Sequence, residues 1–224
     1  MSASTRDAIL GRIRRANGGR PHDPERQRIV DARLAGKAPG VVPRRGQLPH
    51  DEQVALFIAM AEKVHATTAR IGGYGELPAE VSRWLRENNF PADLRLCEDP
   101  RIAGADFEAT ALTIRRGASD GNDLNALSHA EAAIAETGTL CLVSGQENPT
   151  SLNFLPENHI VVIRAADIEG DMEALFPALR QRYGEGRMPR SVNFITGPSR
   201  SGDIEQVLLL GAHGPRALHI IIVG

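Results

Sequence analysis

The chain has 224 residues, of which 42% are hydrophobic, and this is enough for one large domain, or one domain with an arm, but too little for two full domains. Its 26 basic and 28 acidic residues give a net charge of -2, which excludes a general electrostatic attraction to nucleic acid or to an anionic membrane. No run approaches 18 consecutive apolar residues, and the opening MSASTRDAILGRIRRAN lacks the apolar core of a signal peptide, so we expect a cytoplasmic protein.

The first part of the sequence predicts a short helix followed by an arm. Ser4 or Thr5 can cap a helix whose apolar residues share one face, and Asn17 to Gly19 end it. Residues 18–50 are rich in Pro, Gly and Arg and show little periodicity beyond a helical turn at 25–34. We expect residues 1–50 to form an N-terminal helix and extended arm, either a mobile tail or a segment that wraps a partner subunit.

The compact part is expected to be a single domain over residues 51–224. Segments with helical periodicity alternate with short runs typical of strands, and this alternation indicates an α/β fold with a sheet flanked by helices. The expected helices are 51–65, 78–88 and 171–183, and the expected strands are 66–71, 93–97, 109–114, 132–136, 140–144, 159–164 and 191–196. The last two apolar runs, EQVLLLG and ALHIIIVG, fit either a hairpin or, for the first run, a buried helix.

The only two cysteines, Cys97 and Cys141, each lie in an apolar run typical of a strand. Reduced core thiols are therefore expected in preference to a disulfide. An iron–sulfur cluster usually takes four cysteine ligands, so this chain cannot hold one alone.

Three segments in a fixed order, together with the opening ILGRIRRA, resemble the LUD-domain family. They are ETGTL (136–140), LPENHIVVI (155–163) and FITGPSRSGDIEQVLLLGAHGPRALHIIIV (194–223). The resemblance covers roughly residues 50–224. It implies a Rossmann-like fold similar to the superfamily of sugar-phosphate isomerases and coenzyme A transferases.

The same resemblance implies a role in bacterial L-lactate utilization, in which L-lactate is oxidised to pyruvate. Cysteine-rich and iron–sulfur partner proteins carry the clusters in that system, so no cofactor is expected on this chain. The small number of cysteines agrees with this division.

The first candidate site is the polar break formed by Glu136, Thr137, Gly138 and Thr139 between two apolar runs. Gly138 permits a positive φ or a close approach of a ligand to the backbone. A partly buried glutamate at a strand end can act as a general acid or base, which makes Glu136 a candidate catalytic residue. The alternative is a tight turn with a solvated glutamate.

The second candidate is the segment Thr196 to Asp203, which follows the strand-like SVNFI. Gly197, Ser199 and Ser201 can supply backbone and hydroxyl groups to an anion, and Arg200 can bind a carboxylate or phosphate through two hydrogen bonds. The alternative is a strand-to-helix turn capped by Ser201 or Asp203.

The third candidate is His213, within the turn-forming GAHGPR, because an imidazole there can titrate near neutral pH and act as a catalytic acid or base. A histidine with a purely structural role is the alternative. No metal site is expected, since HExxH is absent and no PCxxC follows the HAE at 129–131. The glycines at 72–75 also fail the dinucleotide fingerprint.

The expected function is therefore that of a component of an L-lactate utilization system, acting on a small carboxylate or phosphate-bearing ligand. The sequence leaves open whether this chain is itself the catalytic subunit of an iron–sulfur L-lactate dehydrogenase complex. Two alternatives stay open: a stand-alone enzyme acting on an acyl-coenzyme A, a sugar phosphate or a folate, and a non-catalytic assembly subunit.

Overall fold

The computed structural model describes residues 3–16, 18, 23–36, 40–204 and 207–224, with the side chains of residues 3, 4, 201–204 and 207–209 left out. The chain divides into two compact units, Met1–Val41 and Val42–Gly224. The described residues of the first unit form two helices, α1 (Ala3–Ala16) and α2 (Pro24–Gly36). No described helix is both long and apolar enough to cross a membrane.

The second unit begins nine residues before the expected start at Asp51, because the backbone of residues 42–49 already packs on it. Gly46 lies against Gly170, where an added Cβ would meet the Gly170 carbonyl oxygen at 2.4 Å. Gln53 Nε2 also donates a hydrogen bond to the Gly46 carbonyl oxygen at 3.1 Å. A segment without hydrophobic periodicity is therefore held by backbone contacts, which the sequence pattern does not reveal.

A six-stranded parallel sheet forms the centre of the second unit, in the order β1-β12-β7-β4-β2-β3. Its strands are β1 (Thr67–Ile71), β2 (Asp93–Leu96), β3 (Thr113–Arg116), β4 (Asn125–His129), β7 (Asn158–Arg164) and β12 (Ala217–Val223). Along β7 the buried side chains alternate between the two faces, with Ile160 and Val162 in one apolar cluster and Val161 and Ile163 in another. Burial on both faces requires cover on both, as in other parallel sheets.

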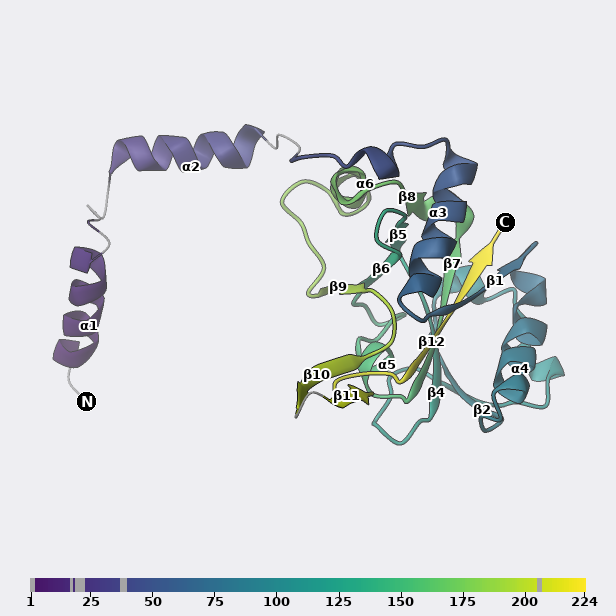
Figure 1. The fold of residues 1–224 in the computed structure, drawn as a ribbon. Helices are drawn as coiled ribbons and strands as arrows, with labels where there is room; N and C mark the ends of the chain where they lie inside the picture. The colour runs from purple at the N-terminus through teal and green to yellow at the C-terminus, as the bar shows by residue number, and fades with distance from the viewer. Residues whose placement is uncertain (1–2, 17, 19–22, 37–39, 205–206) are drawn as a thin grey trace. The chain divides into compact units, whose positions relative to one another are not determined.

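The two faces of this sheet are covered differently (Figure 1). One face packs against α4 (Leu77–Glu87), and the other packs against α3 (His50–Lys63) and a four-stranded sheet of order β8-β5-β6-β9. The four-stranded sheet comprises β5 (Ala132–Ile134), β6 (Thr139–Val143), β8 (Ile168–Glu169) and β9 (Val192–Ile195), and its outer face packs against α6 (Met172–Tyr183). The remaining elements are α5 (Ser151–Phe154) and the hairpin strands β10 (Arg200–Ile204) and β11 (Val207–Leu210).

The predicted α/β class, with helices on both sides of a sheet, is confirmed. Several details differ from the expectations, among them the following. The strand expected at 109–114 is Thr113–Arg116, and β4 was not expected. The final two apolar runs do not pair with each other: β11 pairs with β10, whereas β12 lies between β1 and β7.

Both cysteines are free and buried, as predicted, in two separate apolar clusters. Burial raises the pKa of each thiol to about 12.

Candidate functional site

A pocket of about 270 Å³ lies at the amino ends of β7 and β12, and we call it the amino-edge pocket. His159 and Leu218, the second residues of these strands, are paired in register at its base. The other lining residues come from α5, the end of β9, the loop 196–199, the first residue of β10 and the turn 213–215; they are Asn153, Phe154, Phe194, Ile195, Thr196, Gly197, Pro198, Ser199, Arg200, His213, Gly214 and Pro215. Four of the predicted site residues, Gly197, Ser199, Arg200 and His213, therefore share one pocket.

Three hydrogen bonds join the two loops of this pocket through Ser199. Its backbone N–H donates to the Pro215 carbonyl oxygen at 2.8 Å, and its own carbonyl accepts from the Gly211 N–H at 3.0 Å. Its hydroxyl oxygen accepts from the His213 N–H at 3.2 Å. The exposed imidazole of His213 is thereby held at the rim by its backbone rather than by a bond to its ring.

The carboxyl-terminal end of α3 positions Gly197 and Arg200. Gly197 has φ +74° and approaches Val64 so closely that a Cβ would meet the Val64 carbonyl oxygen at 2.5 Å. Arg200 Nη2 donates to the same carbonyl oxygen at 2.9 Å, which places its positive charge at the negative end of the helix dipole. A guanidinium has five N–H donors, so this bond leaves Arg200 able to bind a carboxylate as well.

The ETGT segment supports this pocket without lining it. Thr139 Oγ1 lies 2.7 Å from Thr137 Oγ1 and 2.7 Å from Thr196 Oγ1, in the pocket wall. Gly138, with φ +66°, packs on α3, where a Cβ would meet the Ala61 nitrogen at 2.4 Å. We expected Thr137, Gly138 and Thr139 to contact a ligand. In the structure they lie behind the pocket wall, where the two threonines make hydroxyl contacts and Gly138 packs on α3.

Glu136 lies outside the amino-edge pocket, between the N-terminus of α6 and the segment before α3. Its Oε1 accepts a hydrogen bond from the Met172 N–H at 3.4 Å, and Arg45 Nε is 3.7 Å from its Oε2. Oε2 is buried and has no hydrogen-bond partner among the described residues. The structure therefore does not bring Glu136 together with His213 or Arg200.

Ser201, the remaining predicted ligand contact, belongs to β10, where its backbone pairs with Leu209. Its side chain lies outside the described part of the chain.

The sequence reasoning missed His159, which is 1% exposed and forms part of the pocket. Burial lowers the pKa of its imidazole to about 3, so the ring is neutral near pH 7. Its Nδ1 has no hydrogen-bond partner among the described residues. The sequence feature that could have identified His159 is a histidine at the start of the apolar run HIVVIR. Periodicity alone assigns this run to a core strand and gives the histidine no further role.

A second polar group lies at the opposite edge, where β2 and β4 end, and we call it the carboxyl-edge cluster. β2 leads outward to β3 whereas β4 leads back to β7, which makes this a topological switch point, where α/β proteins commonly bind ligands. The cluster borders two hollows, of about 410 and 270 Å³, that share Glu131. Its members are Tyr74, Asp99, Arg101, His129, Glu131, Asn148, Arg182 and Tyr183.

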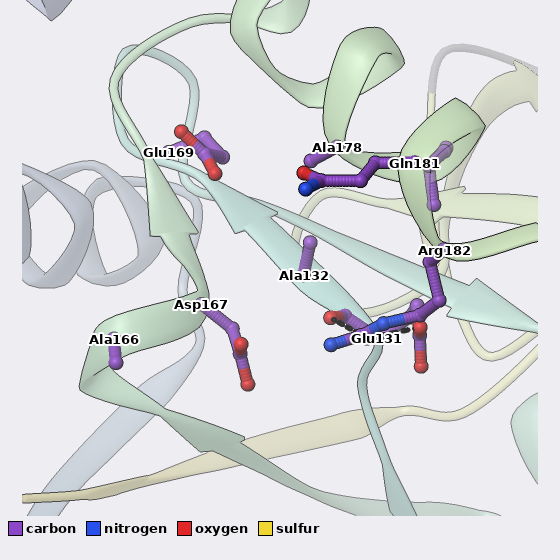
Figure 2. A pocket seen from close by; sticks show the side chains of 9 residues that line it. Glu131, Ala132, Ala166, Asp167, Glu169, Ala178, Gln181 and Arg182 are labelled. Carbon is purple, nitrogen blue, oxygen red and sulfur yellow. Dashed lines mark hydrogen bonds and ion pairs between the residues drawn. The ribbon is translucent and has the colours of Figure 1, made fainter.

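The charges of the carboxyl-edge cluster are largely satisfied by one another. Asp99 accepts hydrogen bonds from Arg101 Nε at 2.8 Å and Arg101 Nη2 at 2.6 Å; burial would raise its pKa, but these bonds lower it to about 2. Figure 2 shows Glu131 joined to Arg182 of α6, with Asp167 and Glu169 across the smaller hollow. Because its buried carboxylates are already paired, this cluster is a weaker candidate for binding an acid than the amino-edge pocket.

Comparison with known proteins matches residues 124–223 to the LUD domain family model. Over 97 residues the chain is 37% identical to lactate utilization protein C of Shouchella clausii, and over 98 residues it is 35% identical to that of Bacillus subtilis. Each match covers 43% of this chain and 42% or 41% of the relative, so the chain spans about two fifths of the length of these curated relatives.

A DUF162 family protein from Deinococcus radiodurans has a similar crystal structure, with a TM-score of 0.59 and 22% sequence identity. The match covers 79% of this chain and 99% of that protein, and it supports the fold. All lining residues of the amino-edge pocket fall within the segment matched to the family model.

Proposed function

We propose that the chain, whose residues 124–223 match the LUD domain family model, takes part in L-lactate utilization by binding a small 2-hydroxy or 2-oxo acid in the amino-edge pocket. The family resemblance seen in the three sequence motifs is confirmed over these residues. The relatives of this domain in Shouchella clausii and Bacillus subtilis are named lactate utilization protein C, and this supports the proposed role.

The observation that carries the proposal is the meeting of the three family motifs at one pocket. His159 comes from the second motif, and Gly197, Arg200 and His213 come from the third. The first motif contacts the wall through the bond between Thr139 and Thr196.

The chemistry of the pocket suits a small hydroxy acid. Arg200 supplies positive charge for a carboxylate, and Ser199 and the backbone around Gly197 supply polar groups. Apolar side chains of Phe154, Leu218 and Pro215 offer a surface for a methyl group. The volume of about 270 Å³ is just below the roughly 300–1,000 Å³ typical of drug-sized ligand sites, so a small ligand is favoured.

Conversion of lactate to pyruvate removes two electrons, and we propose that cysteine-rich and iron–sulfur partner proteins accept them. Cys97 and Cys141 do not fit the ligands of an iron–sulfur cluster, because each is buried in a different group of apolar side chains. Free, reduced thiols are also typical of a cytoplasmic protein, and we propose that location for this chain.

Calorimetric titration of the purified chain with L-lactate, pyruvate and coenzyme A, repeated with the partner proteins added, tests this function. Saturable binding of lactate or pyruvate by the chain alone is the expected result. Binding only in the presence of partners would assign the chain to assembly, and binding of coenzyme A without either acid would favour a transferase-like enzyme.

Replacing Arg200 by alanine should weaken acid binding by on the order of 1.5–3 kcal/mol, or about 10- to 150-fold, because a charged hydrogen bond is lost. Arg70→Ala is the matched control, since Arg70 Nη2 also donates to a backbone carbonyl, that of Gly224, at 2.9 Å. Calorimetry should show no change for this control. Equal affinities for the two variants would remove Arg200 from the site.

A further inference from the structure

The buried hydrogen bonds behind the amino-edge pocket determine which nitrogen of His159 carries the proton. Ser128 Oγ lies 2.6 Å from His159 Nε2 and 3.4 Å from Asn153 Oδ1. A serine hydroxyl has only one proton to donate. Both bonds form together only if Ser128 donates to Asn153 and His159 donates its Nε2–H to Ser128.

This arrangement leaves Nδ1 of His159 as a neutral acceptor with a free lone pair. The atom is buried and lacks a partner within the described structure, and its residue lines the pocket. An unpaired buried polar atom costs free energy, and a ligand or water that donates a hydrogen to it recovers that cost.

We propose that His159 is a specificity-determining residue of the amino-edge pocket: its Nδ1 accepts a hydrogen bond directly from the hydroxyl of a bound 2-hydroxy acid. A 2-oxo acid presents a carbonyl oxygen, which is an acceptor only, so it leaves Nδ1 unpaired. The pocket therefore favours the 2-hydroxy acid over the 2-oxo acid. This inference rests on the proposed function, because it concerns the ligand of the same site.

Ser128 and Asn153 are positioning residues in this arrangement. Ser128 is completely buried in β4 and Asn153 is 3% exposed in α5. Together they orient the imidazole ring and set its tautomer. The low pKa of His159, caused by burial, keeps the ring neutral across the physiological range.

The test compares the affinities of L-lactate, pyruvate and propionate by calorimetry in the full chain. We expect L-lactate to bind at least about tenfold more tightly than pyruvate, the equivalent of one net hydrogen bond. His159→Phe should bring the ratio of lactate to pyruvate affinity down towards one, because a phenyl ring has no acceptor for the lactate hydroxyl, whereas propionate, which has no hydroxyl, shows any general change in the pocket. Arg200→Ala is the matched control, and it should weaken all three acids while preserving the preference for lactate.

If His159→Phe does not fold, Ser128→Ala provides a second variant, and its ratio of lactate to pyruvate affinity should fall towards one. Long-range proton–nitrogen NMR of the wild-type chain should show a protonated Nε2 and an unprotonated Nδ1. The opposite tautomer, or equal wild-type affinities for lactate and pyruvate, would overturn the inference and leave the proposed function standing. Failure to bind any of the three acids would overturn both.

Discussion

The carboxylate of Glu136 is buried, and the residue is only 6% exposed. Among the described residues its ion-pair partner is Arg45, whose side chain is 57% exposed and approaches only to 3.7 Å. Pairs that include such an exposed partner contribute little to stability, since water screens them. Glu136 therefore has a local structural environment that is separate from the amino-edge pocket.

We predict that Glu136→Gln changes the free energy of unfolding by less than about 1 kcal/mol and leaves acid binding unchanged. The amide preserves the shape of the side chain and can still accept from the Met172 N–H. Chemical denaturation and calorimetry measure the two effects, with Arg45→Gln as the matched partner variant. A loss of acid binding in Glu136→Gln alone would restore the catalytic role that the sequence suggested.

The candidate residues in the TGPSR loop and the AHGP turn could be predicted because their chemistry is visible in the sequence. Gly197, Ser199, Arg200 and His213 carry polar and turn-forming character within a short stretch, and they line one pocket. His159 could not be recognised in this way. Its role depends on the register that places it beside Leu218 and on a bond to Ser128, 31 residues away in the sequence.

At the scale of elements, α3 supports two of the family motifs at once. Its backbone contacts Gly138 in the first motif and Gly197 in the third, and both glycines have positive φ. No side chain fits at either point without displacing the helix. The close approach of α3 therefore links the ETGT turn to the wall of the amino-edge pocket.

Gly138→Ala should destabilise the fold by at least about 2 kcal/mol, because strain at positive φ adds to a clash with the Ala61 backbone. Gly75→Ala is the control, since a Cβ there meets nothing within 4 Å and its φ is outside the left-handed region. Thermal and denaturant unfolding compare the two. A change below 0.5 kcal/mol in Gly138→Ala, about the effect of an ordinary surface substitution, would mean that α3 can shift freely.

Helices and central strands with clear periodicity were predicted close to their observed bounds, as for α3, α4 and β7. β4 was missed because its sequence, NALSH, mixes polar and small residues, yet all five are buried. Their burial follows from the central place of β4 between β7 and β2, which is a property of the sheet order and not of the local sequence. The pairing of β11 with β10 likewise depends on the chain reversal between them.

At the scale of the whole molecule, three histidines are held neutral by burial. Burial lowers the pKa values of His129, His159 and His219 to about 4, 3 and 4, from the ordinary value of 6.5 for an exposed imidazole. Below pH 6.5 the unfolded chain takes up protons at these positions before the folded chain does. The folded state is therefore progressively disfavoured as the pH falls.

We predict that the free energy of unfolding decreases between pH 6.5 and 4, with each histidine contributing at most about 1.4 kcal/mol per pH unit. The stability that comes from keeping the three rings neutral is fully present above pH 6.5 and is lost as the pH falls. His219→Gln should reduce the slope of unfolding free energy against pH, because it removes one group that takes up a proton on unfolding. Denaturant unfolding across this range measures the slope, and a flat profile would show that the three rings protonate without unfolding.

The position of β12 between β1 and β7 has a consequence for how the protein is made on the ribosome. β1 is an edge strand whose neighbour in the sheet, β12, is synthesised much later: Thr67 pairs with His219, 152 residues further along the chain. Until residues 217–223 emerge from the exit tunnel, β1 has no partner and one edge of β7 is open. Exposed strand edges of this kind promote aggregation. The nascent chain should therefore be prone to aggregation until β12 closes this part of the sheet.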